Sequence, residues 1–294
     1  MRIQNRERRL DITKDNYKEM FDAEYDYYTN NNQYPVVLYG QRIINIYKNI
    51  NIQVLVTREC TKRCWFCCET GDDTGIVMSD NIYGSLIYLL EKYTEIGITP
   101  NVSITGGEPT LYPGKVNKLI EICDRYKIKA VVNTNGYNIG PIHKCTMNVS
   151  VQGMRPLETH DREELCLQKM IVGSEVKSIV MFMNYHYYLN FVEKYSFRGM
   201  YDRPGDYFEL VSNVSNDSRF EFIQQKTGDY YHFEMYRYLR YNCFLRFTFA
   251  DMSLLREKEV KEKVRYSRAN IIQPNGDTYT GWNYDLNILG TTRR

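Results

Sequence analysis

The sequence contains no run of about 18 consecutive apolar residues, the length that a membrane-spanning helix needs. The N-terminal segment MRIQNRERRLDITKD is charged and is followed by no apolar run, so we expect no secretory signal peptide. These two absences predict a cytoplasmic protein with no membrane partner.

The sequence also lacks an excess of one charge sign. Its 38 basic and 36 acidic side chains leave a formal net charge of +2. A surface built as a whole for nucleic acid carries a basic excess, so we expect no nucleic-acid partner. The sequence also has no internal repeat. It contains no P-loop, no HExxH zinc motif and no Ser–His–Asp order, so nothing supports the reactions that depend on these motifs.

The pattern of apolar residues predicts strands that alternate with helices. Strand patterns occupy residues 52–57, 102–105, 129–133, 147–151, 177–184 and 207–212. Helical patterns occupy residues 79–95, 113–126, 157–172 and 187–197, with Ser79 as an N-cap and Pro113 opening the second helix. This alternation indicates βαβ units, a parallel sheet and a partial (β/α)6 TIM-like barrel.

The chain divides into three expected parts. Residues 1–50 are polar and rich in tyrosine, and we interpret them as an N-terminal extension. Residues 51–213 form the expected barrel core. Residues 214–294 form a C-terminal extension expected to cap the barrel, with a helix at 229–241, a strand at 243–250, a helix at 254–264 and a hairpin turn at Asn275-Gly276-Asp277.

Four of the eight cysteines lie within the segment 60–68, directly after the first predicted strand. Thiols stay reduced in the cytosol, so a tight cluster indicates a metal site or catalysis rather than disulfides. A structural zinc site needs four ligands, commonly two paired knuckles, and the sequence has no second CxxC. Cys68 is a poor fourth ligand because neighbouring side chains point apart. Three thiolates on a cubane iron–sulfur cluster leave one iron open for chemistry.

The spacing Cys60-x3-Cys64-x2-Cys67 resembles the radical S-adenosylmethionine (SAM) superfamily. The resemblance implies a [4Fe–4S] cluster held by these three cysteines, with SAM bound to the fourth iron. Reductive cleavage of SAM then yields a 5′-deoxyadenosyl radical, which abstracts hydrogen from a substrate. Phe66 matches the aromatic position that lies near the adenine in this family.

Three further segments carry the same resemblance, each at the end of a predicted strand. Gly106-Gly107-Glu108-Pro109 looks like the GGEP motif, which meets the methionine amino group, and its glycines permit a close backbone approach. The segment 132–136 resembles the TNG turn near the ribose. The resemblance implies cofactor contacts at Gly106, Gly107, Glu108, Asn133 and Asn135.

The fourth predicted strand ends in Ser150-Val151-Gln152-Gly153, where relatives read Ser-x-Asp-Gly. The resemblance assigns Ser150 to the methionine carboxylate and makes Gln152 a cofactor contact, although glutamine replaces the common aspartate. Asn184 and His186, placed at the end of the fifth predicted strand, are candidate substrate ligands. No catalytic residue is assigned.

Several functional alternatives stay open from the sequence. The first is a small-molecule substrate of nucleotide, sugar or amino-acid type. The second is a peptide, modified by epimerisation or crosslinking. A one-electron donor such as flavodoxin or ferredoxin is the implied partner. Cys243 is the only cysteine after Cys166, so we expect no auxiliary cluster. The alternative from a different functional class is a non-catalytic protein whose cysteines form a structural metal site.

Overall fold

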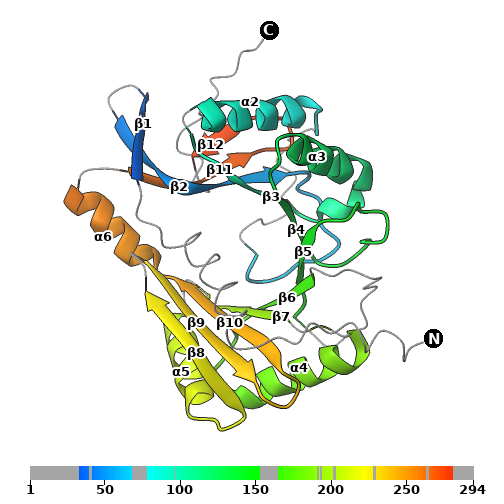
Figure 1. The fold of residues 1–294 in the computed structure, drawn as a ribbon, viewed down its shortest axis with the longest axis vertical. Helices are drawn as coiled ribbons and strands as arrows, with labels where there is room; N and C mark the ends of the chain where they lie inside the picture. Colours follow the sequence, from blue (N-terminus) through cyan, green and yellow to red (C-terminus); the bar gives the residue numbers. More distant parts are fainter. Residues whose placement is uncertain are drawn as a thin grey trace.

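A computed structural model gives the fold of the chain (Figure 1). It describes residues 33–39, 42–67, 78–95, 97–152, 165–190, 192, 194–200, 203–227, 230–262 and 265–280. Cys68 and residues 1–32 of the expected N-terminal extension lie outside the described residues. Within the described part of the chain, no helix combines the length and the apolar character needed to cross a bilayer.

Six parallel strands, neighbours in chain order, form the centre of one large sheet. They are β2 (Arg42–Leu55), β3 (Asn101–Thr105), β4 (Ala130–Thr134), β5 (Thr146–Ser150), β6 (Leu165–Met170) and β7 (Lys194–Arg198). The sheet curves without closing on itself (Figure 1). The predicted fold class, a partial barrel of six parallel strands, is therefore confirmed.

The C-terminal part of the chain extends this sheet at both ends. Next to β7 lie β10 (Cys243–Ala250), β9 (Tyr231–Tyr238) and β8 (Phe220–Thr227), in that order. Next to β2 lie β11 (Arg265–Ile272) and β12 (Thr278–Thr280), and β1 (Gln33–Tyr39) also pairs with β2. Both β10 and β11 run parallel to their core neighbours. The sheet thus continues across residue 213.

Helices cover the outer side of the curved sheet (Figure 1). The helices α2 (Asn81–Glu95), α3 (Pro113–Arg125), α4 (Val176–Asn190) and α5 (Pro204–Ser215) bury apolar faces in one core with the strands. The Ser79 hydroxyl accepts a hydrogen bond from the Asn81 backbone N–H, 3.1 Å away, as expected of an N-cap. The other helices of the described residues are the short η2 (Pro109–Leu111) and α6 (Met252–Glu262), which overlaps the expected helix 254–264.

The last two predicted strands are wrong. Residues 177–184 lie in α4 and residues 207–212 lie in α5, whereas β6 and β7 lie in segments predicted as helical. The predicted helix at 229–241 is also wrong, because β9 occupies it. An apolar run such as Ile179–Met183 fits a buried strand and a buried helix equally well by composition.

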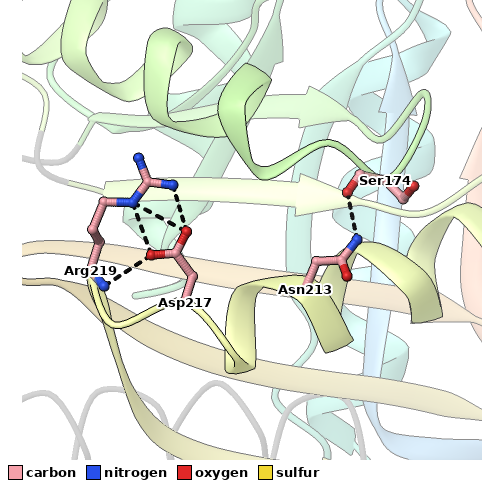
Figure 2. A network of polar contacts seen from close by, with 4 residues as sticks. All are labelled: Ser174, Asn213, Asp217 and Arg219. Atoms are coloured by element: carbon pink, nitrogen blue, oxygen red, sulfur yellow. Dashed lines mark hydrogen bonds and ion pairs between the residues drawn. The ribbon is translucent and has the colours of Figure 1, made fainter.

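Polar contacts brace the segments on either side of α5 (Figure 2). The Asn213 amide donates a 3.0 Å hydrogen bond to the Ser174 carbonyl, which ties α5 to the turn before α4. Arg219 donates to both carboxylate oxygens of Asp217 at the turn into β8. This hydrogen bonding lowers the pKa of Asp217. The pair is solvent-accessible, so its contribution to stability is small.

The central strands have two chemically different faces. On the face toward the helices, Val102, Ile104, Val132 and Met147 are fully buried. On the concave face, several of the alternating residues are polar and only half-buried; these include Ser103, Asn133 and Asn148. The interior of the partial barrel is therefore lined by accessible polar side chains.

Candidate functional site

The cysteine loop begins where β2 ends. The Val56 N–H continues the pairing with β3 by donating to the Thr105 carbonyl at 2.9 Å. A turn in which the Cys67 N–H donates to the Cys64 carbonyl at 3.0 Å then closes the cysteine segment. Cys60 and Cys67 are exposed, Cys64 is half-buried, and all three are free thiols. The structure thus presents three reduced cysteines on one loop at the carboxyl end of a parallel strand.

Gly106 and Gly107 bring the loop after β3 against the cysteine loop. A Cβ atom on Gly106 would lie 2.3 Å from the Thr57 carbonyl oxygen, and one on Gly107 would lie 2.1 Å from that of Glu59. Gly106 also has φ +132°, a conformation that favours glycine. The Gly107 N–H donates to the Thr57 carbonyl at 2.7 Å. Both glycines therefore have a steric reason to be glycine in this fold.

Glu108 is a buried carboxylate that joins the loops after β3 and β4. One of its oxygens accepts hydrogen bonds from the Thr110 N–H (3.0 Å), the Thr110 hydroxyl (2.6 Å) and the Thr134 hydroxyl (2.6 Å). The other oxygen accepts from the Asn135 N–H at 2.6 Å. The side chain is fully buried. Its carboxylate therefore fixes the second and third motifs relative to each other.

Asn135 connects the third motif to the first cysteine. Its amide donates to the Thr61 hydroxyl at 3.1 Å and to the Cys60 sulfur at 3.7 Å. The Lys62 backbone N–H donates to the same sulfur at 3.4 Å. Donors of this kind tune the properties of a bound cluster. Cys60 is thus placed to act as a metal ligand.

A contact with the C-terminal hairpin supports the start of the cysteine loop, and sequence reasoning missed it. Arg58 donates to the Gln273 side-chain oxygen at 2.9 Å. Gln273 follows β11, and the turn Asn275-Gly276-Asp277 lies against α2, where the Ser85 hydroxyl donates to the Gly276 carbonyl at 2.6 Å. The predicted hairpin is confirmed by the antiparallel pairing of β11 with β12. A pairing between residues 215 positions apart leaves no local signal in the sequence.

The loop after β7 also reaches the cysteine loop. The Arg203 guanidinium carbon lies 5.2 Å from the centre of the exposed Trp65 ring, a cation–π geometry. Phe66 is half-buried and meets the Trp65 ring edge to face, with 5.6 Å between ring centres. An aromatic pair therefore lies between Cys64 and Cys67.

Two predicted contacts on β4 and β5 face the concave side. The Asn148 amide donates to the Asn133 side-chain oxygen at 3.0 Å. Ser150, the last residue of β5, is exposed at the same face. Gln152 follows, and its side-chain oxygen accepts from the Met170 N–H at 3.2 Å. The Gln152 side chain thus braces the ends of β5 and β6.

Asn184 and His186 lie elsewhere, and the strand-end placement on which their prediction depended is wrong. Both are in α4, on the outer side of the sheet. His186 is fully buried, with its ring 4.4 Å from that of Phe182. Phe182 in turn contacts Tyr195 and Phe197 of β7. These contacts make His186 part of the packing between α4 and the sheet.

The residues of the cysteine loop fit an iron–sulfur cluster. Among the described residues, no three His, Cys, Asp or Glu side chains converge tightly enough to share a single metal ion. A cubane cluster takes one thiolate per iron. The fit depends instead on the three free cysteines, the two N–H donors at Cys60 and the close approach at Gly106 and Gly107.

Comparisons with solved structures give a similar fold. Streptococcus suis SuiB bound to the precursor peptide SuiA is 14% identical, with a TM-score of 0.50 over 82% of this chain and 63% of that chain. SuiB bound to S-adenosylmethionine is 13% identical, with a TM-score of 0.49 over 84% of this chain and 60% of that chain. Histidine-tagged anSMEcpe with bound AdoMet is also 13% identical, with a TM-score of 0.49 over 81% of this chain and 75% of that chain. The chain thus spans less than two thirds of the length of SuiB.

Comparisons at the sequence level concern the barrel. None of the curated proteins compared with this chain matches it. Residues 54–180 match the sequence model of the radical SAM superfamily. This range begins in β2 and includes the cysteine loop, Glu108 and Asn135. Residues 54–180 are therefore a radical SAM domain, of a superfamily whose members use a [4Fe–4S] cluster and S-adenosylmethionine.

Proposed function

We propose that this chain is a radical SAM enzyme with one [4Fe–4S] cluster, held by Cys60, Cys64 and Cys67. The observation that carries the proposal is the bonding of the cysteine loop to the two neighbouring motif loops. Gly107 contacts its backbone, and Asn135 donates to the Cys60 sulfur. Three motifs at the ends of adjacent parallel strands thus form one site, and such strand ends are where barrel enzymes carry their functional groups.

When bound, the cluster and SAM together supply a 5′-deoxyadenosyl radical that abstracts a hydrogen atom from substrate. The residues of the chain position these groups and exclude water. Gly106 and Gly107 let the loop after β3 lie directly against the backbone of the cysteine loop, and Phe66 offers an aromatic face. Asn133, Asn135 and Ser150 supply neutral polar atoms for the nucleotide and the methionine.

Glu108 and Gln152 have a more indirect part in this proposal. The Glu108 carboxylate already accepts four hydrogen bonds within the loops, so its side chain positions Asn135 and Thr110. The Gln152 side chain likewise holds the end of β5 to β6. Contacts from these two positions to SAM are therefore assigned to the backbone.

For the substrate we propose a small molecule of nucleotide, sugar or amino-acid type, transformed in the cytoplasm. The half-buried polar face of β3, β4 and β5 offers neutral hydrogen-bonding groups suited to such a molecule. A flavodoxin or ferredoxin would supply the electron. A peptide is the second class to test, because SuiB, of similar fold, was bound to the precursor peptide SuiA.

Anaerobic reconstitution tests the proposed chemistry. We expect about four irons per chain. Addition of dithionite and SAM should release 5′-deoxyadenosine. Cys64→Ala should abolish this release, whereas Cys68→Ala, the matched change at the adjacent cysteine, should retain both iron and release. Zinc in place of iron, with no SAM cleavage by the reconstituted protein, would identify a non-catalytic metal-binding protein instead.

The substrate class is tested by stimulation of 5′-deoxyadenosine release with a low-mass metabolite fraction. A small-molecule substrate predicts that the stimulation survives treatment of the fraction with protease. Loss of the stimulation after protease treatment would assign a peptide substrate.

A further inference from the structure

The strands of the barrel bring cations, and no carboxylates, to its inner face. None of the strands β2 to β7 and β10 contains an Asp or Glu residue. Phe197 of β7 and Phe247 of β10 are buried in the core shared with the helices. Side chains alternate along a strand, so Lys194 and Arg198 of β7 and Arg246 of β10 face the concave side. Positive charge therefore collects on the inner face where β7 pairs with β10.

Arg246 is held in place on this face. Its Nε and one terminal nitrogen donate to the hydroxyl of Ser196, the register partner on β7, at 3.2 and 3.1 Å. Its guanidinium carbon lies 5.7 Å from the centre of the Phe233 ring of β9. A guanidinium presents five N–H donors in a rigid fork that matches the geometry of carboxylate and phosphate groups. Ser196 thus orients a group that is suited to bind an oxyanion.

Arg198 places a second guanidinium at the accessible end of the same face. It is the last residue of β7 and is half-buried. Its register partner on β10 is Thr248, two residues beyond Arg246, so the two arginines are diagonal neighbours on paired strands. The carboxyl ends of the parallel strands also carry the cysteine loop and the motif loops. An anion can therefore approach Arg198 and Arg246 from the side on which the proposed chemistry takes place.

This cationic region is separate from the residues assigned to the cofactor. Ser150, which the proposed function assigns to the methionine carboxylate, ends β5, and β6 lies between β5 and β7. At the usual strand spacing of about 4.8 Å, β7 and β10 lie about 10 and about 14 Å from β5. The polar inner residues Ser103, Asn133 and Asn148 are neutral. The inner face thus has a neutral side, which includes the proposed cofactor contacts, and a cationic side.

We propose that the substrate carries an anionic group, a carboxylate or a phosphate, which Arg246 and Arg198 bind where β7 pairs with β10. The inference rests on the proposed function and narrows its substrate class to the anionic nucleotides, sugars and amino acids. The guanidinium groups hold the charged end of the substrate, and its remainder extends across β6 toward the cofactor. Binding by charge at one end fixes which part of the molecule faces the radical.

Calorimetric titration with small anions tests this site without any turnover. The protein is the reconstituted full chain, with its cluster kept oxidised and SAM saturating, so that the binding site for the cofactor's own carboxylate is filled. The probes are inorganic phosphate and malonate, which distinguish a phosphate site from a carboxylate site. We expect the wild type to bind at least one probe at low ionic strength. Arg246→Gln should raise the Kd for that probe about tenfold or more, the effect of losing hydrogen bonds to a charged group.

Three further variants make the result specific. Arg198→Gln should raise the same Kd about threefold or more, and it decides the question if the Arg246 variant does not fold. Arg246→Lys keeps the charge without the planar fork, so its Kd should lie between those of the wild type and Arg246→Gln. Arg125→Gln is the matched control, because Arg125 is exposed at the end of α3 on the outer side of the sheet. It should leave the Kd for the probe unchanged.

The Kd for SAM, measured on the same variants, separates binding from structure. Arg246→Gln should change it less than about twofold. An equal rise in the Kd for SAM and for the probe would make Arg246 a structural residue and overturn the inference. Binding of neither probe by the wild type, or probe binding that the Arg246 and Arg198 variants leave unchanged, would also overturn it. In each of these cases a wild-type protein that contains iron and cleaves SAM keeps the proposed function. Failure of the wild type to take up iron or bind SAM overturns both.

Discussion

Glu108 shows how one side chain serves a site without facing it. The carboxylate is removed from water, and four hydrogen bonds from Thr110, Thr134 and Asn135 replace its hydration. Hydrogen bonds to a charged acceptor are stronger than those between neutral groups. The loops after β3 and β4 are thereby held in one arrangement before any ligand binds.

We expect Glu108→Gln to lower the free energy of unfolding by about 1–3 kcal/mol, because an amide NH2 replaces one acceptor oxygen and meets the donors that faced it. Chemical denaturation measures this change. Glu91→Gln is the matched control, since Glu91 is exposed on α2 and accepts one hydrogen bond, from Tyr126. An equal effect of the two substitutions would contradict the role given to Glu108.

The sequence predicts the residues of the site where a short motif carries them. Cys60, Gly107 and Asn135 lie in such motifs, and in the structure the three loops touch one another. Gln273 could not be found in this way. Its placement depends on the position of the C-terminal hairpin, which is a tertiary property.

At the scale of the element, the alternation of apolar residues predicts β3, β4 and β5 correctly, but the pattern after β5 predicts the wrong elements. β3, β4 and β5 each alternate between buried and accessible residues, the pattern of a strand with one packed face. In α4, by contrast, Ile179, Phe182, Met183 and His186 are buried at helical spacing within a nearly continuous apolar run. In such a run the apolar residues do not show whether their period is that of a helix or of a strand. The sequence pattern therefore predicts strands where α4 and α5 lie and helices where β6 and β7 lie.

The turn between β11 and β12 gives a prediction at this scale. Gly276 has φ +93°, and a Cβ atom there would lie 2.6 Å from the Asn81 Cβ atom at the start of α2. Gly276→Ala should lower the free energy of unfolding by about 2–4 kcal/mol, because both the backbone conformation and the contact oppose an added methyl group. Thermal or urea unfolding measures the loss.

Two other glycines separate the cost of the backbone conformation from the cost of the steric contact. Gly97 has φ +75° and open space around it, so Gly97→Ala should cost only about 1–2 kcal/mol for the backbone conformation. Gly140 has open space and no positive φ, so Gly140→Ala should change stability by less than about 1 kcal/mol. If Gly276→Ala costs no more than Gly97→Ala, the packing of the hairpin on α2 is not tight.

At the scale of the whole molecule, the order of the strands in space differs from their order in the chain. The sheet runs from β12 and β11 through β2 to β7 and then to β10, β9 and β8. The expected boundary near residue 213 follows a change in sequence pattern, yet strands from beyond it pair with both β2 and β7. Sequence patterns report local structure, and they do not reveal a strand that returns to the edge of an earlier sheet.

This arrangement predicts the behaviour of a fragment that ends at residue 213. Such a fragment lacks β11 and β10, which pair with β2 and β7, and it exposes Phe197 and Tyr207, which stack on Phe247 and Phe249 of β10. Unpaired strand edges and exposed aromatic rings favour aggregation. We therefore expect the full chain to unfold in a cooperative urea transition, followed by circular dichroism, and the fragment to aggregate or to show no cooperative transition. A soluble fragment with the transition midpoint of the full chain would instead make residues 1–213 an independent folding unit, because the strands of the C-terminal part would then contribute nothing to the stability of the barrel.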